Sequence, residues 1–299
     1  MTLRLMDSLM GAQLGYTPAS WSTPRVWLCA GLSPKKFNCV DPGIGEVKSI
    51  DIRSKQCRTM FEFPQLYSIR EMISLRGNSS EIESIAMLIL SKFTQKFLEI
   101  WVLESINDAS FKVKGRSPRI ACPESKLKGR MVELKSGLGV ILEDPSILHI
   151  WRVGDAAILD FPIPDCNYET SGMCVMENVL GREEVLALAF WQHNSIGLFA
   201  IEMSGLVLVR QKELEFSPYG LLWIASKRTL LICNNLENKE EMYALRMMEC
   251  DFTSYNVTLD LKRSIEVLSW CVLPENNGNE KTIAIFDCKS YAVMIFEMA

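Results

Sequence analysis

A short apolar segment recurs along this chain at a nearly constant interval, and this spacing limits the folds that the chain can adopt. Each segment can be marked by its third residue, and the marked residues are Asp51, Trp101, Trp151, Phe199, Leu245 and Phe296. The intervals between them are 50, 50, 48, 46 and 51 residues. A repeat of this length indicates that one structural unit is copied along the whole chain.

Each interval contains two or three further apolar segments that are short enough to be strands. In the second interval they include 69–75 and 84–91, and the marked segment covers 97–104; in the third interval the turn 144–146 separates the marked segment from the one before it. Repeats of roughly 40–50 residues with four strands each are typical of a β-propeller, where each repeat forms one blade. The sequence therefore predicts an all-β fold, a single β-propeller of about six four-stranded blades, with seven as the alternative.

The last repeat has only three apolar segments before the chain ends, at 265–273, 282–287 and 291–298. An N-terminal segment, 3–9, is a suitable fourth strand, because closed sheet architectures avoid unpaired edges. We therefore expect the N-terminal strand to close the ring. The predicted domain spans 1–299, with the closing strand and its connection in 1–24 and the blades in 25–299.

Two other folds compete with this prediction. Residues 80–83 read as a helix capping box, and apolar residues follow at helical spacing up to 101, so this stretch alone favours a helix. Strands are favoured because Trp101 lies one repeat from Trp151. Pro145, in the corresponding segment before Trp151, rules out a long helix there. A pair of β-sandwiches is the other alternative, but it would not produce such a regular period.

The composition is that of a folded protein in a reducing compartment. Hydrophobic residues make up 48% of the chain, and the net charge of −4 gives no overall reason to expect a nucleic-acid partner. Ten cysteines are scattered without a Cys-x-x-Cys pair, as expected for free thiols packed like small apolar side chains. The N-terminus lacks the apolar core of a signal peptide, and no segment is long enough to span a membrane. We expect an intracellular protein, in the nucleus or the cytoplasm, that does not associate with membranes.

The residue pairs Ile100-Trp101 and Ile150-Trp151 lie one repeat apart, and each ends a predicted hairpin. In this they resemble the WD-repeat form of the β-propeller superfamily. The chain has Val102 and Arg152 where that family usually has Asp after the Trp, and it lacks the Gly-His dipeptide. The resemblance implies a rigid platform that displays loops to protein partners, commonly within a larger assembly, and it implies no catalytic residues.

No group of residues suggests catalysis. The two histidines, His149 and His193, have no second metal-ligating residue at a suitable spacing. The segment 41–49 ends in Lys-Ser but lacks the glycines of a phosphate-binding loop, and Gly-x-Ser-x-Gly is absent. We therefore expect no catalytic, metal or cofactor-binding residues, and no enzyme activity.

One local feature could bind a partner. Residues 112–135 contain eight basic side chains and only two acidic ones, with Pro118 and Pro123 indicating a loop. A basic loop could contact an acidic protein, chromatin or nucleic acid, or it could be a solvated connection between blades. Large aromatic residues are the other candidates, and Trp21 stands out because it lies in a turn-like segment. The candidate partner-binding residues are Lys112, Lys114, Arg116, Arg119, Lys126, Lys128, Arg130 and Trp21.

The sequence thus predicts a non-catalytic protein-interaction scaffold that is a subunit of an intracellular multiprotein complex. The alternative is a propeller that binds nucleic acid or chromatin through the basic segment 112–135. The sequence identifies neither the partner nor the face of the propeller that binds it.

Overall fold

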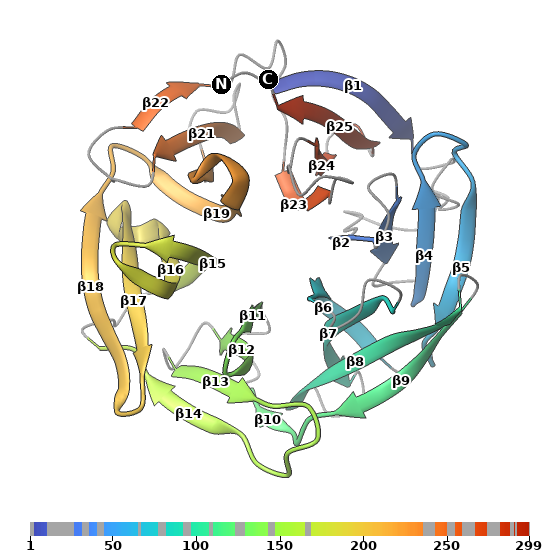
Figure 1. The fold of residues 1–299 in the computed structure, drawn as a ribbon, viewed down its shortest axis with the longest axis horizontal. Helices are drawn as coiled ribbons and strands as arrows, with labels where there is room; N and C mark the ends of the chain where they lie inside the picture. The colour runs from blue at the N-terminus through green and yellow to red at the C-terminus, as the bar shows by residue number, and fades with distance from the viewer. Residues whose placement is uncertain are drawn as a thin grey trace. The chain divides into compact units, whose positions relative to one another are not determined.

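A computed structural model of the chain describes most residues between Leu3 and Met298 (Figure 1). It describes residues 3–10, 27–31, 36–40, 45–64, 67–76, 82–91, 97–107, 110–122, 129–142, 147–164, 169–235, 243–249, 255–258, 267–273, 282–287, 290 and 292–298. The chain divides into two compact units. Unit 1 consists of Met1–Ala121 and Ile265–Ala299, and unit 2 of Cys122–Ser264.

The described residues of unit 1 form three antiparallel sheets. The first has the strand order β1-β25-β24-β23, the second β2-β3-β4-β5, and the third β10-β8-β7-β6 with β9 also paired to β8. The bounds of these strands are β1 Leu3–Met10, β2 Trp27–Ala30, β3 Lys36–Val40, β4 Glu46–Asp51, β5 Cys57–Glu62, β6 Tyr67–Leu75, β7 Ser84–Ser91, β8 Phe97–Asn107, β9 Ser110–Arg116, β10 Ile120–Ala121, β23 Val267–Leu273, β24 Thr282–Asp287 and β25 Ala292–Met298.

Unit 2 contains three antiparallel sheets of four strands, each connected in simple chain order: β11 to β14, β15 to β18, and β19 to β22. Two 3₁₀ turns, η2 (Trp191–His193) and η3 (Ala225–Lys227), connect strands within these sheets. The strands are β11 Gly129–Leu134, β12 Gly137–Leu142, β13 Ile147–Trp151, β14 Leu159–Pro162, β15 Thr170–Val179, β16 Arg182–Phe190, β17 Ser195–Glu202, β18 Gly205–Glu213, β19 Ser217–Ile224, β20 Thr229–Asn235, β21 Tyr243–Glu249 and β22 Tyr255–Thr258.

The sequence period corresponds to one sheet per repeat. The six marked residues lie in β4, β8, β13, β17, β21 and β25. Each of these is the third strand, in chain order, of its repeat. The spacing therefore predicted both the length of the repeat and the position of the marked strand within it. The helical alternative for 80–104 is wrong for the described residues, because β7 and β8 occupy most of this stretch.

The predicted number of regular four-stranded blades is wrong. Among the described residues, five sheets have four strands, not six or seven, and the remaining sheet, which contains β6 to β10, has five. In that sheet, β9 and β10 both pair with β8, so two short strands occupy the position that one strand occupies elsewhere. Pro118 interrupts this position because it has no backbone N–H. Next to Pro118, the Ser117 hydroxyl accepts a hydrogen bond from the backbone N–H of Ile100, at 2.8 Å.

The two ends of the chain pair in one sheet. β1 runs antiparallel to β25, with Leu3 opposite Met298 and Met10 opposite Ala292 (Figure 1). Residues 3–9 therefore supply the fourth strand of the last sheet, as the sequence predicted. Closure of a complete ring, and the assignment of the whole chain to one domain, stay predictions.

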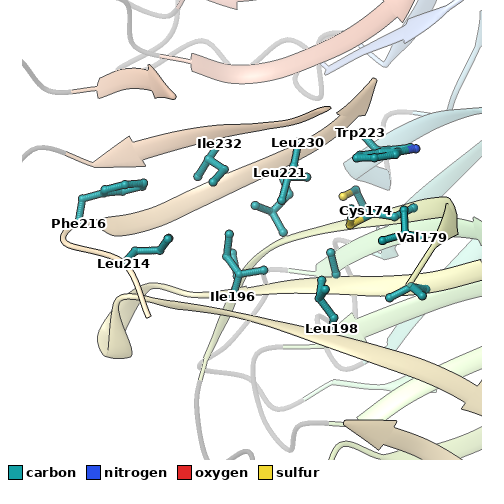
Figure 2. Packing of buried hydrophobic residues seen from close by; sticks show 14 residues of the cluster. Cys174, Val179, Ile196, Leu198, Leu214, Phe216, Leu221, Trp223, Leu230 and Ile232 are labelled. Carbon is teal, nitrogen blue, oxygen red and sulfur yellow. The ribbon is translucent and has the colours of Figure 1, made fainter. Parts of the chain in front are cut away.

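The hydrophobic core lies between neighbouring sheets rather than under a single one. In unit 2, one buried cluster joins the β15–β18 and β19–β22 sheets, with Ile196 and Leu198 facing Leu230 and Ile232 (Figure 2). A second cluster joins the β11–β14 sheet to β15–β18. Two clusters in unit 1 similarly connect the β2–β5 sheet to its two neighbours. This explains the continuous apolar runs of β7 and β16, since both faces of these strands are covered.

The first strands of neighbouring sheets approach closely in unit 2. A Cβ atom on Gly172 of β15 would lie 2.8 Å from the Cα of Gly220 in β19, closer than real Cβ contacts allow. Glycine is therefore required at this crossing. Both strands have a register shift at this point, between Thr170 and Gly172 and between Pro218 and Gly220. The Ser171 hydroxyl connects the two strands by donating a hydrogen bond to the Pro218 carbonyl, at 2.6 Å.

No helix in the described part of the chain is long and apolar enough to cross a membrane.

Candidate interaction surface

The described basic residues of the segment 112–135 divide between the two units. Lys112, Lys114 and Arg116 lie on β9, and Arg119 lies between β9 and β10, all in unit 1. These four residues are exposed. The structure therefore places one half of the predicted site on a strand rather than in a loop. Arg130, on β11, belongs to unit 2.

Two acidic residues of β8 compensate much of the charge on β9. Glu104 lies directly opposite Lys112 in the β8–β9 ladder. Its carboxylate forms ion pairs with Lys114 at 2.6 Å and with Lys112 at 3.8 Å. The hydrogen bond from Lys114 is the main reason why the pKa of Glu104 is below its ordinary value. The negative partner of these lysines lies outside the basic segment in sequence.

Arg116 interacts with an aromatic ring. Its guanidinium carbon lies 3.7 Å from the centroid of the Trp101 ring, and the two residues are opposite each other in the β8–β9 ladder. A cation over an indole face is held by the negative quadrupole of the ring. Trp101 itself is buried and packs against Phe63 and Tyr67, with ring centroids 5.5 and 5.1 Å away. Trp101 is therefore a core residue that also holds Arg116 at the surface.

Glu99 joins the remaining members of this group. Its carboxylate accepts hydrogen bonds from the indole N–H of Trp101, at 3.1 Å, and from Nε of Arg119, at 3.2 Å. The Arg119 guanidinium also lies 5.8 Å from the Phe97 ring centroid. These contacts form two groups on β8, β9 and the segment that follows. In one, Glu104 pairs with Lys112 and Lys114; in the other, Trp101 contacts Arg116 and Glu99 binds Arg119, so each group has a net charge of +1.

Arg130 has a structural contact in unit 2. Its Nε donates a hydrogen bond to the Ser171 carbonyl at 2.9 Å, which connects β11 to β15. The side chain is half-buried, and its positive charge acts on the buried thiol of Cys233. Three other candidate residues, Lys126, Lys128 and Trp21, lie outside the described residues.

Sequence reasoning missed Glu99 and Glu104 because it counted only charges between 112 and 135. The signal was nonetheless present, since antiparallel pairing of two predicted strands places residues far apart in sequence opposite each other. In β8 and β9, this pairing brings Glu104 to Lys112 and Trp101 to Arg116.

The two histidines and most of the thiols are in positions unlike those of an active site. His149 and Asp160 face each other across β13 and β14, with Nδ1 2.7 Å from the carboxylate oxygen, and His193 is exposed in η2. Burial raises the pKa of Cys233 and of Cys271 to about 12, which keeps these thiols protonated and poorly nucleophilic. Among the described residues, no three His, Cys, Asp or Glu side chains are placed to hold a metal ion.

Only the comparison with solved structures found proteins that are similar to this chain. No protein-family model matches the chain, and no curated protein matches its sequence. Among solved structures, 677 chains match it. One belongs to the "Crystal Structure of Mitotic Checkpoint Complex": it is 9% identical, with a TM-score of 0.60, and the match covers 99% of this chain and 94% of that chain.

This chain has a β-propeller fold. The match spans nearly all of the chain, and the six sheets each contribute one repeat of the sequence period. At 9% identity the similarity concerns the fold and does not transfer a partner or a binding site.

Proposed function

We propose that this protein is a non-catalytic scaffold that binds other proteins as a subunit of an intracellular complex, in the nucleus or the cytoplasm. The observation that carries this proposal is the β-propeller fold, which matches a chain from a multiprotein complex over 99% of this chain. Propellers present short loops and strand edges on a rigid body, and binding surfaces of this kind need no reactive groups.

The chemistry of the described residues supports the non-catalytic part of the proposal. An enzyme of this fold would need titratable side chains that converge on one site. The charged residues that do converge, on β8 and β9, are engaged in cross-strand pairs and in stacking on Trp101. Such contacts stabilise the sheet, and they leave the cationic ends at the surface, where a partner can reach them.

Quantitative affinity purification of the full chain from its own cells tests the scaffold proposal. We expect at least one protein partner to be recovered in a fixed ratio to the chain and to remain bound through size-exclusion chromatography. Recovery of the chain as a free monomer, with no partner in a fixed ratio, would contradict the proposal.

Nucleic-acid binding through residues 112–135 is the second candidate, and its support is the net positive charge of this segment. Binding by phosphate contacts would weaken steeply with salt and would be lost when Lys126 and Lys128 are replaced by Glu. Arg130 is a poor residue for this test because its hydrogen bond to Ser171 connects two strands. Fluorescence anisotropy with labelled DNA and RNA at several salt concentrations makes the measurement, and an absence of salt-dependent binding argues against this candidate.

A further inference from the structure

β18 is a sheet-edge strand with exposed aliphatic side chains. It is the last strand of the β15–β18 sheet, and among the described residues only β17 pairs with it (Figure 1). Val207 is 39% exposed and Leu208 is 37% exposed. Met203, in the turn that leads into β18, is fully exposed. Aliphatic side chains and unpaired backbone groups thus occur together on this edge.

The positions of Val207 and Leu208 show how a partner could cover both. Consecutive residues in a strand point to opposite faces of the sheet, and these two residues precede the irregularity at Val209. A partner lying on one face of the sheet would cover only one of them. A strand added at the edge would lie beside both, and it would also satisfy the unpaired backbone groups.

Two other edge strands, β9 and β14, have features that block strand addition, whereas β1 also exposes aliphatic side chains, Leu5 and Met6. β9 exposes Lys112, Lys114 and Arg116, and β14 has only four residues and ends in Pro162. Charged side chains, prolines and short length are the usual means by which proteins protect sheet edges. β18 has nine residues and no proline, and its first half, Leu206 to Val209, is entirely aliphatic.

The second half of β18 gives the edge a charge preference. Arg210 and Lys212 follow the aliphatic residues, with Glu213 as the acidic residue of the strand. Acidic side chains opposite Arg210 and Lys212 would form cross-strand ion pairs.

We propose that β18 binds an extended segment of a partner protein as an added antiparallel strand. The aliphatic side chains of that segment would lie beside Val207 and Leu208, and its acidic side chains beside Arg210 and Lys212. This inference rests on the proposed scaffold function and names a surface and a partner chemistry for it.

A synthetic nine-residue peptide is the probe, matched in length to β18. It has two aspartates in its N-terminal half and alternating valines in its C-terminal half, so antiparallel pairing places the aspartates near Arg210 and Lys212. Fluorescence anisotropy with the full chain measures the dissociation constant. Two control peptides have lysines in place of the aspartates, or N-methyl groups on alternate backbone amides, which remove hydrogen-bond donors.

We expect saturable binding of the aspartate peptide, binding about tenfold weaker for the lysine peptide, and loss of binding for the N-methylated peptide. Amide hydrogens of β18 should exchange more slowly when the aspartate peptide is present. The double variant Val207→Lys, Leu208→Lys should weaken binding about tenfold or more, because lysine protects a sheet edge. Ile106→Lys is the matched control, since Ile106 is also exposed but lies on β8 in unit 1.

A second variant does not depend on the aliphatic residues. Lys212→Glu should reverse the peptide preference, so that the lysine peptide binds more tightly than the aspartate peptide. No saturable binding, or binding that N-methylation leaves unchanged, would overturn the proposal. Dimerisation of the chain that the double variant abolishes would also overturn it, because a second copy would then be the occupant.

The experiment separates this inference from the scaffold proposal. If the double variant still recovers its cellular partner in the same ratio, the scaffold function stands and the β18 edge is not its binding site. If the peptide binds as expected but no cellular partner is found, the edge binds extended segments and the scaffold proposal fails.

Discussion

At the scale of single residues, Leu180 adopts a backbone conformation that is unfavourable for leucine. Leu180 and Gly181 form the two-residue connection between β15 and β16, and both have positive φ values, 54° and 71°. Such turns favour Asn-Gly, because Asn tolerates the left-handed region better than a branched apolar residue does. The Leu180 side chain is also 38% exposed, so the core gains little from it.

Leu180→Asn should therefore stabilise the protein by about 1 kcal/mol, by relieving the backbone conformation. Thermal unfolding followed by circular dichroism measures the change as a rise in Tm. Leu159→Asn is the control, since Leu159 is exposed on a strand with ordinary backbone geometry, and it should give no stabilisation. A fall in Tm for Leu180→Asn would show that the leucine side chain has a role that outweighs its backbone cost.

The lysine next to Glu104 should control the titration of that carboxylate. Because Lys114 holds the pKa of Glu104 below its ordinary value, this pair stabilises the folded protein above the unfolded-state pKa and loses its effect as pH falls through the folded-state pKa. Lys114→Ala should raise the pKa of Glu104 toward its ordinary value, as seen by NMR titration. Lys112→Ala should raise it less, since Lys112 is 3.8 Å away and Lys114 is 2.6 Å away. Equal effects of the two variants would contradict this assignment.

At the scale of elements, the pairing of β1 with β25 completes a sheet from residues at opposite ends of the sequence. Leu9 is buried in the cluster that joins this sheet to the β2–β5 sheet, whereas Leu5, on the same strand, is 47% exposed. The strand therefore contributes both ladder hydrogen bonds and a buried side chain.

Leu9→Ala should destabilise the protein by about 2–5 kcal/mol, because it leaves a cavity in a packed cluster. Leu5→Ala provides a control on the same strand and should cost about 0.5 kcal/mol or less. Urea unfolding of both variants makes the comparison. Equal small effects would mean that β1 does not pack as the structure describes.

At the scale of the whole molecule, buried thiols report on whether the chain unfolds as one domain. Cys271 lies in unit 1 and Cys233 in unit 2, and burial protects both from thiol reagents. Cys57 is half-buried and should react first among the described cysteines of the native protein, because the other six are buried.

If the chain is a single cooperative domain, Cys271 and Cys233 should become reactive at the same rate as denaturant is added. Alkylation followed by peptide mass spectrometry measures each site separately, and the modification of Cys57 confirms that the reagent is active. Clearly different rates for Cys271 and Cys233 would show that the two units unfold independently.

Much of the fold could be predicted because each repeat places its buried strands at the same intervals along the sequence. Each marked residue occurs at the same place in its sheet, so spacing alone located the third strands. The divided strand at β9 and β10 could not be predicted from spacing. The break lies beside Pro118, which has no backbone N–H, and Ser117, whose hydroxyl accepts a hydrogen bond from the backbone N–H of Ile100, and local features of this kind leave no periodic signal.

The sequence by itself determined that the chain is an all-β repeat, how long each repeat is, and where its third strand lies. The reason is that strands buried on both faces are continuous apolar segments, which are recognisable in the sequence without knowledge of their neighbours in space. Only the tertiary structure decided which charges meet. The basic residues of β9 stand out in sequence, but their partners Glu99 and Glu104 reach them through strand pairing. The exposed edge of β18 is likewise a tertiary property, since exposure depends on which neighbours cover a strand.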